Sequence, residues 1–309
     1  MSEIQNPGAA PADSLRVMKI PVADAIAYAY KFTLTHLGTI IGLCWVPLVL
    51  IAVLQFLPYA LGGNPMAPAE NATIQGRQGL ENLGSSLLIL LLYSIMYVPV
   101  TRQALGLRQG PAVIHFAFGA PEFRVFGALC VFLLVLLTMG IGIGVLGLIF
   151  GGLALASGRN ALVGLIFALI FLTAVLGFIY ATVRLGFLLV PVAVAEERIS
   201  LTRSWILARQ NFWRILGVLV AVLLPIYLLH LIGLLAIVGP GLLAALPSDP
   251  NQAEQVLAAR FAMVGQHMPA YLGLTLILAP FSIGLAIGAS AFGYRALVPG
   301  RGHGMATTA

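Results

Sequence analysis

The stretch "VFGALCVFLLVLLTMGIGIGVLGLIFGGLALA", residues 125–156, decides the fold class of this chain. It contains no charged residue. A run of about 20 apolar residues is long enough for a helix to cross the hydrocarbon core of a bilayer. The whole 309-residue chain shares this character, since 60% of its residues are hydrophobic and 8% are charged. Soluble domains are about 45–50% apolar and about 25% charged. The sequence therefore predicts an integral membrane protein.

Working outward from this stretch, we find six apolar segments long enough to span a bilayer. Their approximate limits are 35–59, 84–106, 125–153, 161–184, 213–237 and 270–296. We expect an all-α, polytopic transmembrane bundle that forms a single integral membrane domain over residues 19–298. Residues 1–18 lack the apolar core of a signal peptide, and we interpret them as a disordered cytosolic tail. Residues 299–309 are expected to form a short cytosolic tail at the C-terminus.

The basic residues indicate how the bundle is oriented. Of the 16 Lys and Arg residues, 13 fall in the two tails and in the connections after the second and fourth spans, and 3 fall in the other connections. Because cytoplasmic loops collect Lys and Arg, this distribution places both termini in the cytoplasm. The net charge of +6 has the same explanation, so we predict no nucleic-acid partner.

The stretch "RSWILARQNFWRILG", residues 203–217, gathers three arginines and two of the three tryptophans. Both residue types favour the membrane interface, where a ring or an aliphatic stem is buried and a polar end stays wet. On a helical wheel, one narrow face holds Leu201, Trp205, Ala208 and Phe212, and the opposite face holds Arg203 and Arg214. This pattern predicts an amphipathic helix in the membrane plane before the fifth span, and residues 22–32 predict another before the first. A solvated turn with ordinary interfacial anchors is the alternative interpretation.

The chain also shows an internal similarity. "NFWRILGVLVAVLL" (211–224) resembles "PEFRVFGALCVFLL" (121–134) and, more weakly, "HLGTIIGLCW" (36–45). The second, fourth and sixth spans each end with one arginine, namely Arg102, Arg184 and Arg295. We interpret this as three pseudo-repeats of two spans each, with chance similarity between apolar helices as the alternative. The repeat predicts that the three arginines share one depth and reach headgroup phosphates or the acids Glu122, Glu196 and Glu197.

Several other motifs carry little chemistry. "GIGVLG" (142–147) matches a dinucleotide fingerprint but lies within a span and has no acid nearby. Its glycines, with Gly140 and Gly151, give the small-xxx-small spacing of packed helices, which predicts that the third span is central or bent. "LGFLLVPVAVA" (185–195) is uncharged, so we expect it to re-enter the interface or to extend the helix into the cytosol under cover of other segments. His230 is interpreted as a solvated or hydrogen-bonded residue.

The acids are all outside the six segments, which argues against a proton-coupled transporter. Glu196, Glu197 and Arg198 are neighbours, and we expect a structural ion pair there in preference to a catalytic acid pair. Cys44 and Cys130 give neither a disulfide framework nor metal-ligand spacing. No catalytic or metal-binding motif is present, so we predict no enzyme activity, no metal and no cofactor.

Residues 184–219 resemble a poorly characterised bacterial family. It includes the membrane domain found beside some glycerophosphodiester phosphodiesterases and related stand-alone multi-span proteins. The features that carry the resemblance are an arginine exit (Arg184), Val194 with Glu196, the pair Ser204-Trp205 and the entry Asn211 to Arg214. Gln210 stands where the family usually has glycine. The resemblance implies a helical bundle in the bacterial inner membrane and supplies no activity.

Two functional hypotheses follow. The first is a non-catalytic membrane protein that engages anionic lipid headgroups, or a membrane or cytosolic protein partner, at its cytoplasmic face. The alternative is a permease or facilitator for a lipidic or weakly polar solute, since the spans contain many prolines and glycines. An intramembrane enzyme is a third and weaker possibility. The candidate residues for lipid or interface contact are Arg102, Arg184, Arg198, Arg203, Trp205, Arg209, Trp213, Arg214 and Arg295.

Overall fold

The computed structural model describes residues 19–60, 72–107, 116–156, 161–245, 247 and 249–298. The two predicted tails, 1–18 and 299–309, lie outside these residues. The regular secondary structure of the described residues is entirely helical. Its elements are α1 (Val22–Thr35), α2 (Leu37–Ala60), α3 (Ala72–Ala104), α4 (Ala120–Ala156), α5 (Ala161–Gly186), α6 (Leu189–Ala195), α7 (Leu201–Ala208), α8 (Phe212–Val238), the 3-10 helix η2 (Pro240–Leu243), α9 (Pro250–Gln266) and α10 (Met268–Leu297).

Six segments of the described chain are long and apolar enough to cross a membrane. They are Leu37–Leu57, Glu81–Ala104, Ala120–Leu153, Gly164–Ala195, Phe212–Val238 and Met268–Leu297. The prediction of an all-α bundle with six spans is therefore confirmed, and most boundaries agree within a few residues. The main difference is the fourth span, which was expected to end at residue 184. Its apolar character continues through α6, a separate short helix.

Helix α6 follows α5 after a two-residue turn and is covered by other helices. Leu189, Val192 and Ala193 are almost completely buried, and the helix packs against α3, α4 and α10. An uncharged segment outside a span needs such cover, because its apolar side chains would otherwise face water. The expected cover for residues 185–195 is therefore observed, but α6 is a separate helix and does not continue α5 as expected.

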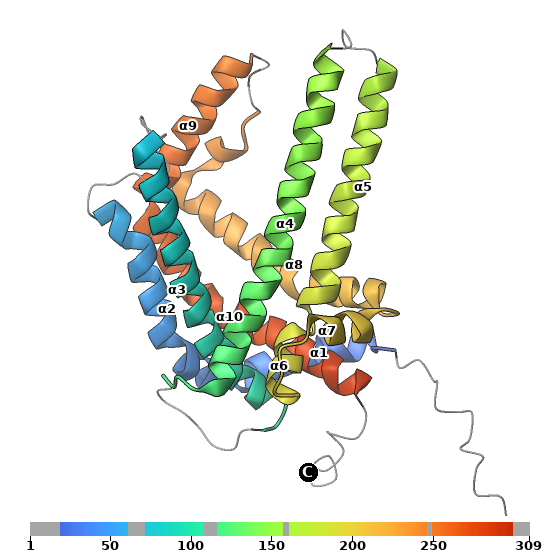
Figure 1. Ribbon diagram of the computed structural model, residues 1–309. Helices are drawn as coiled ribbons and strands as arrows, with labels where there is room; N and C mark the ends of the chain where they lie inside the picture. The colour runs from blue at the N-terminus through green and yellow to red at the C-terminus, as the bar shows by residue number, and fades with distance from the viewer. Residues whose placement is uncertain are drawn as a thin grey trace, which may run out of the picture.

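The bundle has two ends, and different helices lie at each of them (Figure 1). Helices α1, α6 and α7 lie at one end, together with the first turns of α4 and α8 and the last turns of α3, α5 and α10. This end, called the arginine face below, carries every one of the nine candidate residues. Helix α9 lies at the other end, called the opposite face. All connections that were predicted to be basic and are described therefore gather on one side.

Helix α10 is the central helix of the described bundle. It packs against α1, α2, α3, α6 and α8, and most residues from Ile283 to Tyr294 are buried. Two glycines allow this close packing, since a Cβ atom at Gly288 would lie 3.2 Å from the Cα atom of Ala29 in α1, and one at Gly284 would lie 2.9 Å from the side chain of Thr33. Small residues at a helix interface let two backbones approach, and here they join α10 to α1.

The third span was expected to be central or bent, and the expectation of a central position is wrong. No residue in the most apolar part of α4 is buried, and added Cβ atoms at Gly140, Gly144 and Gly151 would meet no atom within 4 Å. Helices α4 and α5 pack against each other, and in Figure 1 their ends away from the arginine face stand apart from the other spans, although α4 also packs against α3 and α5 against α8. A small-xxx-small spacing allows another helix to pack closely, but it does not ensure that one does. The central helix is α10 and not α4.

The three similar segments bury equivalent positions, as the repeat requires. Ile40, Val125 and Ile215 follow the matched positions directly, and all three are 0% exposed. Three residues further along, Leu43, Ala128 and Val218 are also buried. The three arginines Arg102, Arg184 and Arg295 lie in the last turns of α3, α5 and α10. The three segments thus turn the same face of the helix toward the interior of the bundle.

The two expected amphipathic helices are present but are not simple surface helices. Helix α1 is packed into the bundle, and its residues Ala25 and Ala29 are 0% exposed. Helix α7 ends at Ala208, so Phe212 belongs to α8 and the expected four-residue face is divided between two helices. Within α7, Ala208 is buried and Leu201 and Trp205 are half-buried, which agrees with the expected apolar side.

Candidate functional site

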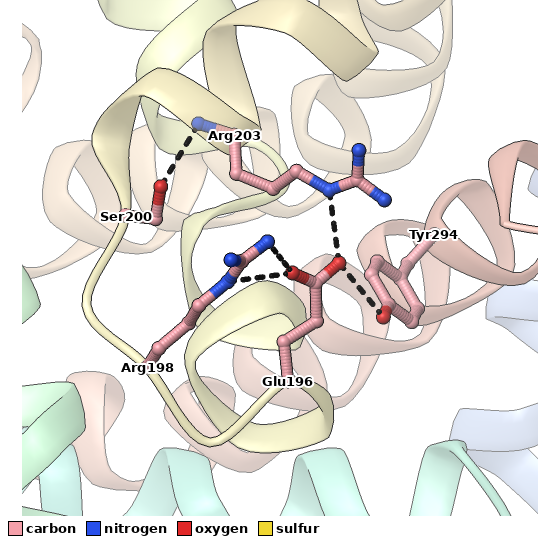
Figure 2. A network of polar contacts seen from close by, with 5 residues as sticks. All are labelled: Glu196, Arg198, Ser200, Arg203 and Tyr294. Atoms are coloured by element: carbon pink, nitrogen blue, oxygen red, sulfur yellow. Dashed lines mark hydrogen bonds and ion pairs between the residues drawn. The ribbon is translucent and has the colours of Figure 1, made fainter.

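Glu196 is the centre of a polar network on the arginine face (Figure 2). Its Oε2 atom accepts hydrogen bonds from Nε and Nη2 of Arg198 at 3.0 and 2.6 Å, and its Oε1 atom accepts one from Nε of Arg203 at 3.0 Å. The hydroxyl of Tyr294, in α10, donates to the same Oε1 atom at 3.3 Å. The Glu196 side chain is only 8% exposed. The expected ion pair is confirmed, and it joins the α6–α7 turn to the central helix.

The turn that carries this network has a defined backbone. Glu197 adopts a positive φ of 53°, a left-handed conformation that costs a non-glycine residue about 1 kcal/mol. Its carboxylate pairs with Arg124 of α4 at 3.6 Å. Ser200 then caps α7, because its Oγ atom accepts the backbone N–H of Arg203 at 3.1 Å. The turn is thus tied to α4 and α7, and it aims Arg203 at Glu196.

The charge state of Glu196 follows from these contacts. Burial by itself raises the pKa of this carboxyl group, but the hydrogen bonds and the positive charges of Arg203 and Arg198 outweigh burial and lower its pKa below the usual value. A carboxylate with a lowered pKa stabilises the fold above the pKa of unfolded glutamate, about 4.3, and loses this effect as the pH falls through its own pKa.

This sign gives a prediction for Glu196→Gln. We expect its deficit in unfolding temperature relative to the wild type to be constant between about pH 7 and pH 5 and to shrink below about pH 4, where Glu196 is protonated. Thermal unfolding in detergent, followed by circular dichroism, measures this deficit. Glu197→Gln is the control, since a side chain that is 71% exposed gives a small difference at any pH. A Glu196→Gln deficit that widens on acidification contradicts the assignment.

Arg184 is the most enclosed of the nine candidates, with 4% of its surface exposed. Its Nη1 atom donates to the hydroxyl of Tyr180 at 2.5 Å, and its Nη2 atom donates to the backbone oxygen of Trp205 at 2.8 Å. Its guanidinium lies over the indole of Trp205, 3.7 Å from the ring centroid. Ser204 adds a bond from its Oγ atom to the backbone oxygen of Leu185 at 2.8 Å. Arg184 and Trp205 therefore fasten α7 to the end of α5.

Asn211 and Arg214 hold the segment before α1. The Oδ1 atom of Asn211 accepts the backbone N–H of Ile20 at 3.0 Å, and Nη1 of Arg214 donates to the backbone oxygen of Ile20 at 2.9 Å. Two side chains at the start of α8 thus bind both the backbone N–H and the backbone oxygen of Ile20. Ile20 is 0% exposed, so these bonds also satisfy groups that water cannot reach. The Asn-Phe-Trp-Arg motif is a structural clamp.

The remaining candidates, Arg102, Arg209, Trp213 and Arg295, are exposed or half-buried. Arg102 and Arg209 are exposed, and their side chains make no hydrogen bond or ion pair with any residue that the structure describes. Trp213 is 78% exposed, and Phe123, at the equivalent position of α4, is 54% exposed. Arg295 is half-buried with its guanidinium 4.6 Å from the ring centroid of Tyr28. The three span-end arginines thus occupy three different environments, and none makes an ion pair with the described acids.

Arg295 also borders a cavity of about 480 Å³ on the arginine face. The cavity lies between the end of α3, the end of α6 and the end of α10, and its wall includes both Glu196 and Glu197. One cation beside two carboxylates makes a poor site for an anion. We therefore do not place headgroup phosphate in this cavity.

A second cavity, of about 320 Å³, lies between α3, α8 and α10, among residues of three membrane spans. Its polar lining residues are Tyr93, Tyr97, Tyr227, His230, Thr275 and Ser282, and we call it the tyrosine cavity. The expectation for His230 is confirmed, because its Nδ1 atom lies 3.1 Å from the backbone oxygen of Ile226. The sequence did not point to the tyrosines, although Tyr93 and Tyr97 are four residues apart and share one face of α3.

The described residues give no support for a metal site or a disulfide. No three His, Cys, Asp or Glu side chains of the described residues are close enough together to hold a metal ion. Cys44 and Cys130 are both free thiols. The comparisons with protein-family models, with curated proteins and with solved structures found no match. The resemblance of residues 184–219 to a bacterial membrane family therefore stays a prediction.

Proposed function

We propose that this chain is a non-catalytic protein of the bacterial inner membrane that engages anionic lipid headgroups with its arginine face. In this proposal the arginine face is cytoplasmic, as the positive-inside rule predicts. The observation that carries the proposal is the charge of that face. Among the described residues it has ten Lys and Arg and four Asp and Glu, whereas the opposite face has two arginines and three acids.

The cations differ in what they offer to a headgroup. Glu196 already binds Arg198 and Arg203, and Arg214 is engaged by Ile20. Arg102 and Arg209 are exposed, which leaves their guanidinium groups available for phosphate. A basic residue near an anionic surface contributes about 1 kcal/mol, and salt screens this contribution. The proposal therefore rests on Arg102 and Arg209 and not on all nine candidates.

Exposed aromatic residues favour lipid over a protein partner as the first ligand of this face. Trp213 lies in the first turn of α8 and Phe123 in the first turn of α4, and both rings are exposed beside an arginine at the entry of a span. Rings at such positions lie in the headgroup region of a bilayer. Ring and arginine side chains would then be at one depth, within reach of the same headgroups.

The test compares phosphatidylglycerol with phosphatidylcholine. Quenching of tryptophan fluorescence by brominated lipids in vesicles gives the relative binding constant of the two lipids. We expect the wild type to prefer phosphatidylglycerol at low salt. We expect Arg102→Gln/Arg209→Gln to lower that preference about tenfold or more, since two charges contribute about 2 kcal/mol.

The matched control is Arg260→Gln on the opposite face, where Arg260 donates to the backbone oxygens of Leu242 and Ala244 at 3.2 and 2.7 Å. We expect this variant to keep the wild-type preference. Equal binding of the two lipids by the wild type, or an equal loss in the control, contradicts the proposal. A preference that persists in Arg102→Gln/Arg209→Gln would point to a different basic site.

A second candidate function is a facilitator for a lipidic or weakly polar solute. The tyrosine cavity favours it, because a carried solute needs a binding place within the spans and this one has polar walls without any carboxylate. Helices α8 and α10, which line it, contain Pro225 and Pro280 within their lengths. Each proline removes one helical hydrogen bond and gives these two helices a point at which they bend.

A further inference from the structure

We propose that the tyrosine cavity binds a neutral lipid that carries free hydroxyl groups, such as a monoacylglycerol. The first argument is the state of its tyrosines. No hydrogen bond joins the hydroxyl of Tyr93, Tyr97 or Tyr227 to another residue that the structure describes. A hydroxyl group without a partner in an apolar environment loses the hydrogen bonds that it makes in water, which is unfavourable. Tyr93 and Tyr97 are partly buried and line the cavity, so their unpartnered hydroxyls favour a polar occupant.

The lining excludes a charged headgroup. The residues around the cavity include no Asp, Glu, Lys or Arg, and the apolar part of the wall is formed by Leu223, Ile226, Ala279, Ile283 and Ala286. An ion in such surroundings would lose its hydration without gaining an opposite charge. The occupant is therefore neutral, unlike the anionic lipids proposed for the arginine face.

The hydrogen-bonding groups indicate which neutral headgroup fits. The Nδ1 atom of His230 faces a carbonyl oxygen, which can only accept, so Nδ1 carries the proton and Nε2 is an acceptor. The hydroxyl of Thr275 donates to the backbone oxygen of Tyr271 at 3.0 Å, and that of Ser282 donates to the backbone oxygen of Ala279 at 2.9 Å. Because both hydroxyls already donate, the side-chain oxygens of Thr275 and Ser282 can only accept a further hydrogen bond.

The cavity thus presents acceptors from three residues and donors from three tyrosines. A ligand that satisfies both kinds of group must itself donate and accept, as a hydroxyl-bearing headgroup does. A quinone or a simple ester has only acceptors and would leave the acceptors on His230, Thr275 and Ser282 unpaired. A free hydroxyl is therefore the feature that the cavity selects.

The size and position of the cavity fit the headgroup of a lipid whose tail lies outside. Its volume of about 320 Å³ is at the lower end of small-molecule sites, which are about 300–1,000 Å³. It suits a glycerol headgroup with the first carbons of a chain and is too small for a whole acyl chain. Tyr227 is 65% exposed on the surface of α8, so the cavity has an edge at the lipid-facing surface. An acyl chain can leave there and lie along the apolar helices.

The experiment uses the full chain in detergent and three probes that share one acyl chain. 1-Oleoylglycerol has donors and acceptors, methyl oleate has acceptors only, and oleate is an anion. Native mass spectrometry gives the bound fraction of each probe during a titration. We expect 1-oleoylglycerol to bind about tenfold more tightly than methyl oleate, since two hydrogen bonds contribute about 1–3 kcal/mol. Oleate is expected to bind no more tightly than methyl oleate.

The variant Tyr97→Phe/Tyr227→Phe removes two hydroxyls and keeps both rings. We expect it to bind 1-oleoylglycerol about tenfold more weakly and methyl oleate as the wild type does. Tyr271→Phe is the matched control, because Tyr271 lies in α10 and does not line the cavity. Ala286→Phe fills the cavity and is expected to abolish the binding of 1-oleoylglycerol, with the unfolding temperature reporting whether the variant is folded.

Equal binding of 1-oleoylglycerol and methyl oleate by the wild type would show that the cavity selects no hydroxyl and holds only water or an acyl chain. Unchanged affinity in Tyr97→Phe/Tyr227→Phe, or tighter binding of oleate, would also overturn the proposal. The inference deepens the second candidate function, but it concerns binding alone. A probe that binds and does not cross the bilayer of proteoliposomes contradicts the facilitator and leaves the binding site in place.

Discussion

Arg184→Ala is expected to lower the free energy of unfolding by about 3–5 kcal/mol. The guanidinium of Arg184 is buried, stacks on Trp205 and donates to two oxygen atoms. A desolvated cation–π contact contributes about 2 kcal/mol, and a hydrogen bond from a charged group contributes about 1.5–3 kcal/mol. Truncation also leaves the backbone oxygen of Trp205 without this donor. The link between α5 and α7 is lost as a result.

Unfolding by sodium dodecyl sulfate in mixed micelles measures this loss, with the fluorescence of Trp205 as one signal. Arg198→Ala is the matched control, because Arg198 also binds an acceptor on the arginine face but its side chain is 59% exposed. Its partner Glu196 is buried but keeps Arg203 and Tyr294 when Arg198 is removed, so we expect Arg198→Ala to cost about 1 kcal/mol. Arg184→Lys should recover only part of the stability, since an ammonium group cannot stack as a planar guanidinium does. Equal losses in Arg184→Ala and Arg198→Ala would contradict the buried role of Arg184.

Gly288→Leu is the second large expected effect, a loss of about 2–3 kcal/mol in unfolding free energy. A Cβ atom at Gly288 would lie 3.1 Å from Phe32 and 3.2 Å from the backbone of Ala29. The rest of a leucine side chain has no free volume between these atoms, so α1 must move away from α10. Helix α1 also packs against α8, and its displacement would disturb both contacts.

The control for Gly288→Leu is Gly144→Leu in α4, where an added Cβ atom meets nothing within 4 Å. We expect this variant to stay within about 1 kcal/mol of the wild type or to be slightly more stable, because leucine is the better helix former. Both unfolding free energies are measured in the same mixed micelles. A large loss in Gly144→Leu would mean that α4 has a packing partner outside the described chain.

Span positions were predictable because they depend on local composition. Any helix with the apolar content of residues 125–153 is costly to expose to water, wherever its neighbours lie. The arginines at the ends of α3, α5 and α10 were predictable for a similar reason, since each follows an apolar span within one helix. No helix was expected in the connection after the fifth span, where α9 forms, because hydropathy detects apolar spans and does not detect a helix as polar as α9.

Contacts between distant segments were not predictable in the same way. Asn211 and Arg214 were correctly singled out as a motif, but their partner Ile20 lies about 190 residues away and has no signature of its own. Trp205 and Arg184 were assigned to lipid because both residue types favour the interface, and they bind each other instead. The lining residues of the tyrosine cavity come from three helices, α3, α8 and α10. No single one of these helices has a sequence pattern that indicates a cavity.

The length of α4 has a consequence for the bilayer around the protein. The uncharged part of its span, residues 125–153, measures about 44 Å, whereas Leu37–Leu57 of α2 has 21 residues and measures about 32 Å. A hydrocarbon core of about 30 Å matches α2, but α4 exceeds it even at a tilt of about 40°. Hydrophobic mismatch therefore falls on one flank of the molecule. Lipids beside α4 and α5 must stretch while those beside α2 need not, so the protein imposes a gradient of membrane thickness on its surroundings.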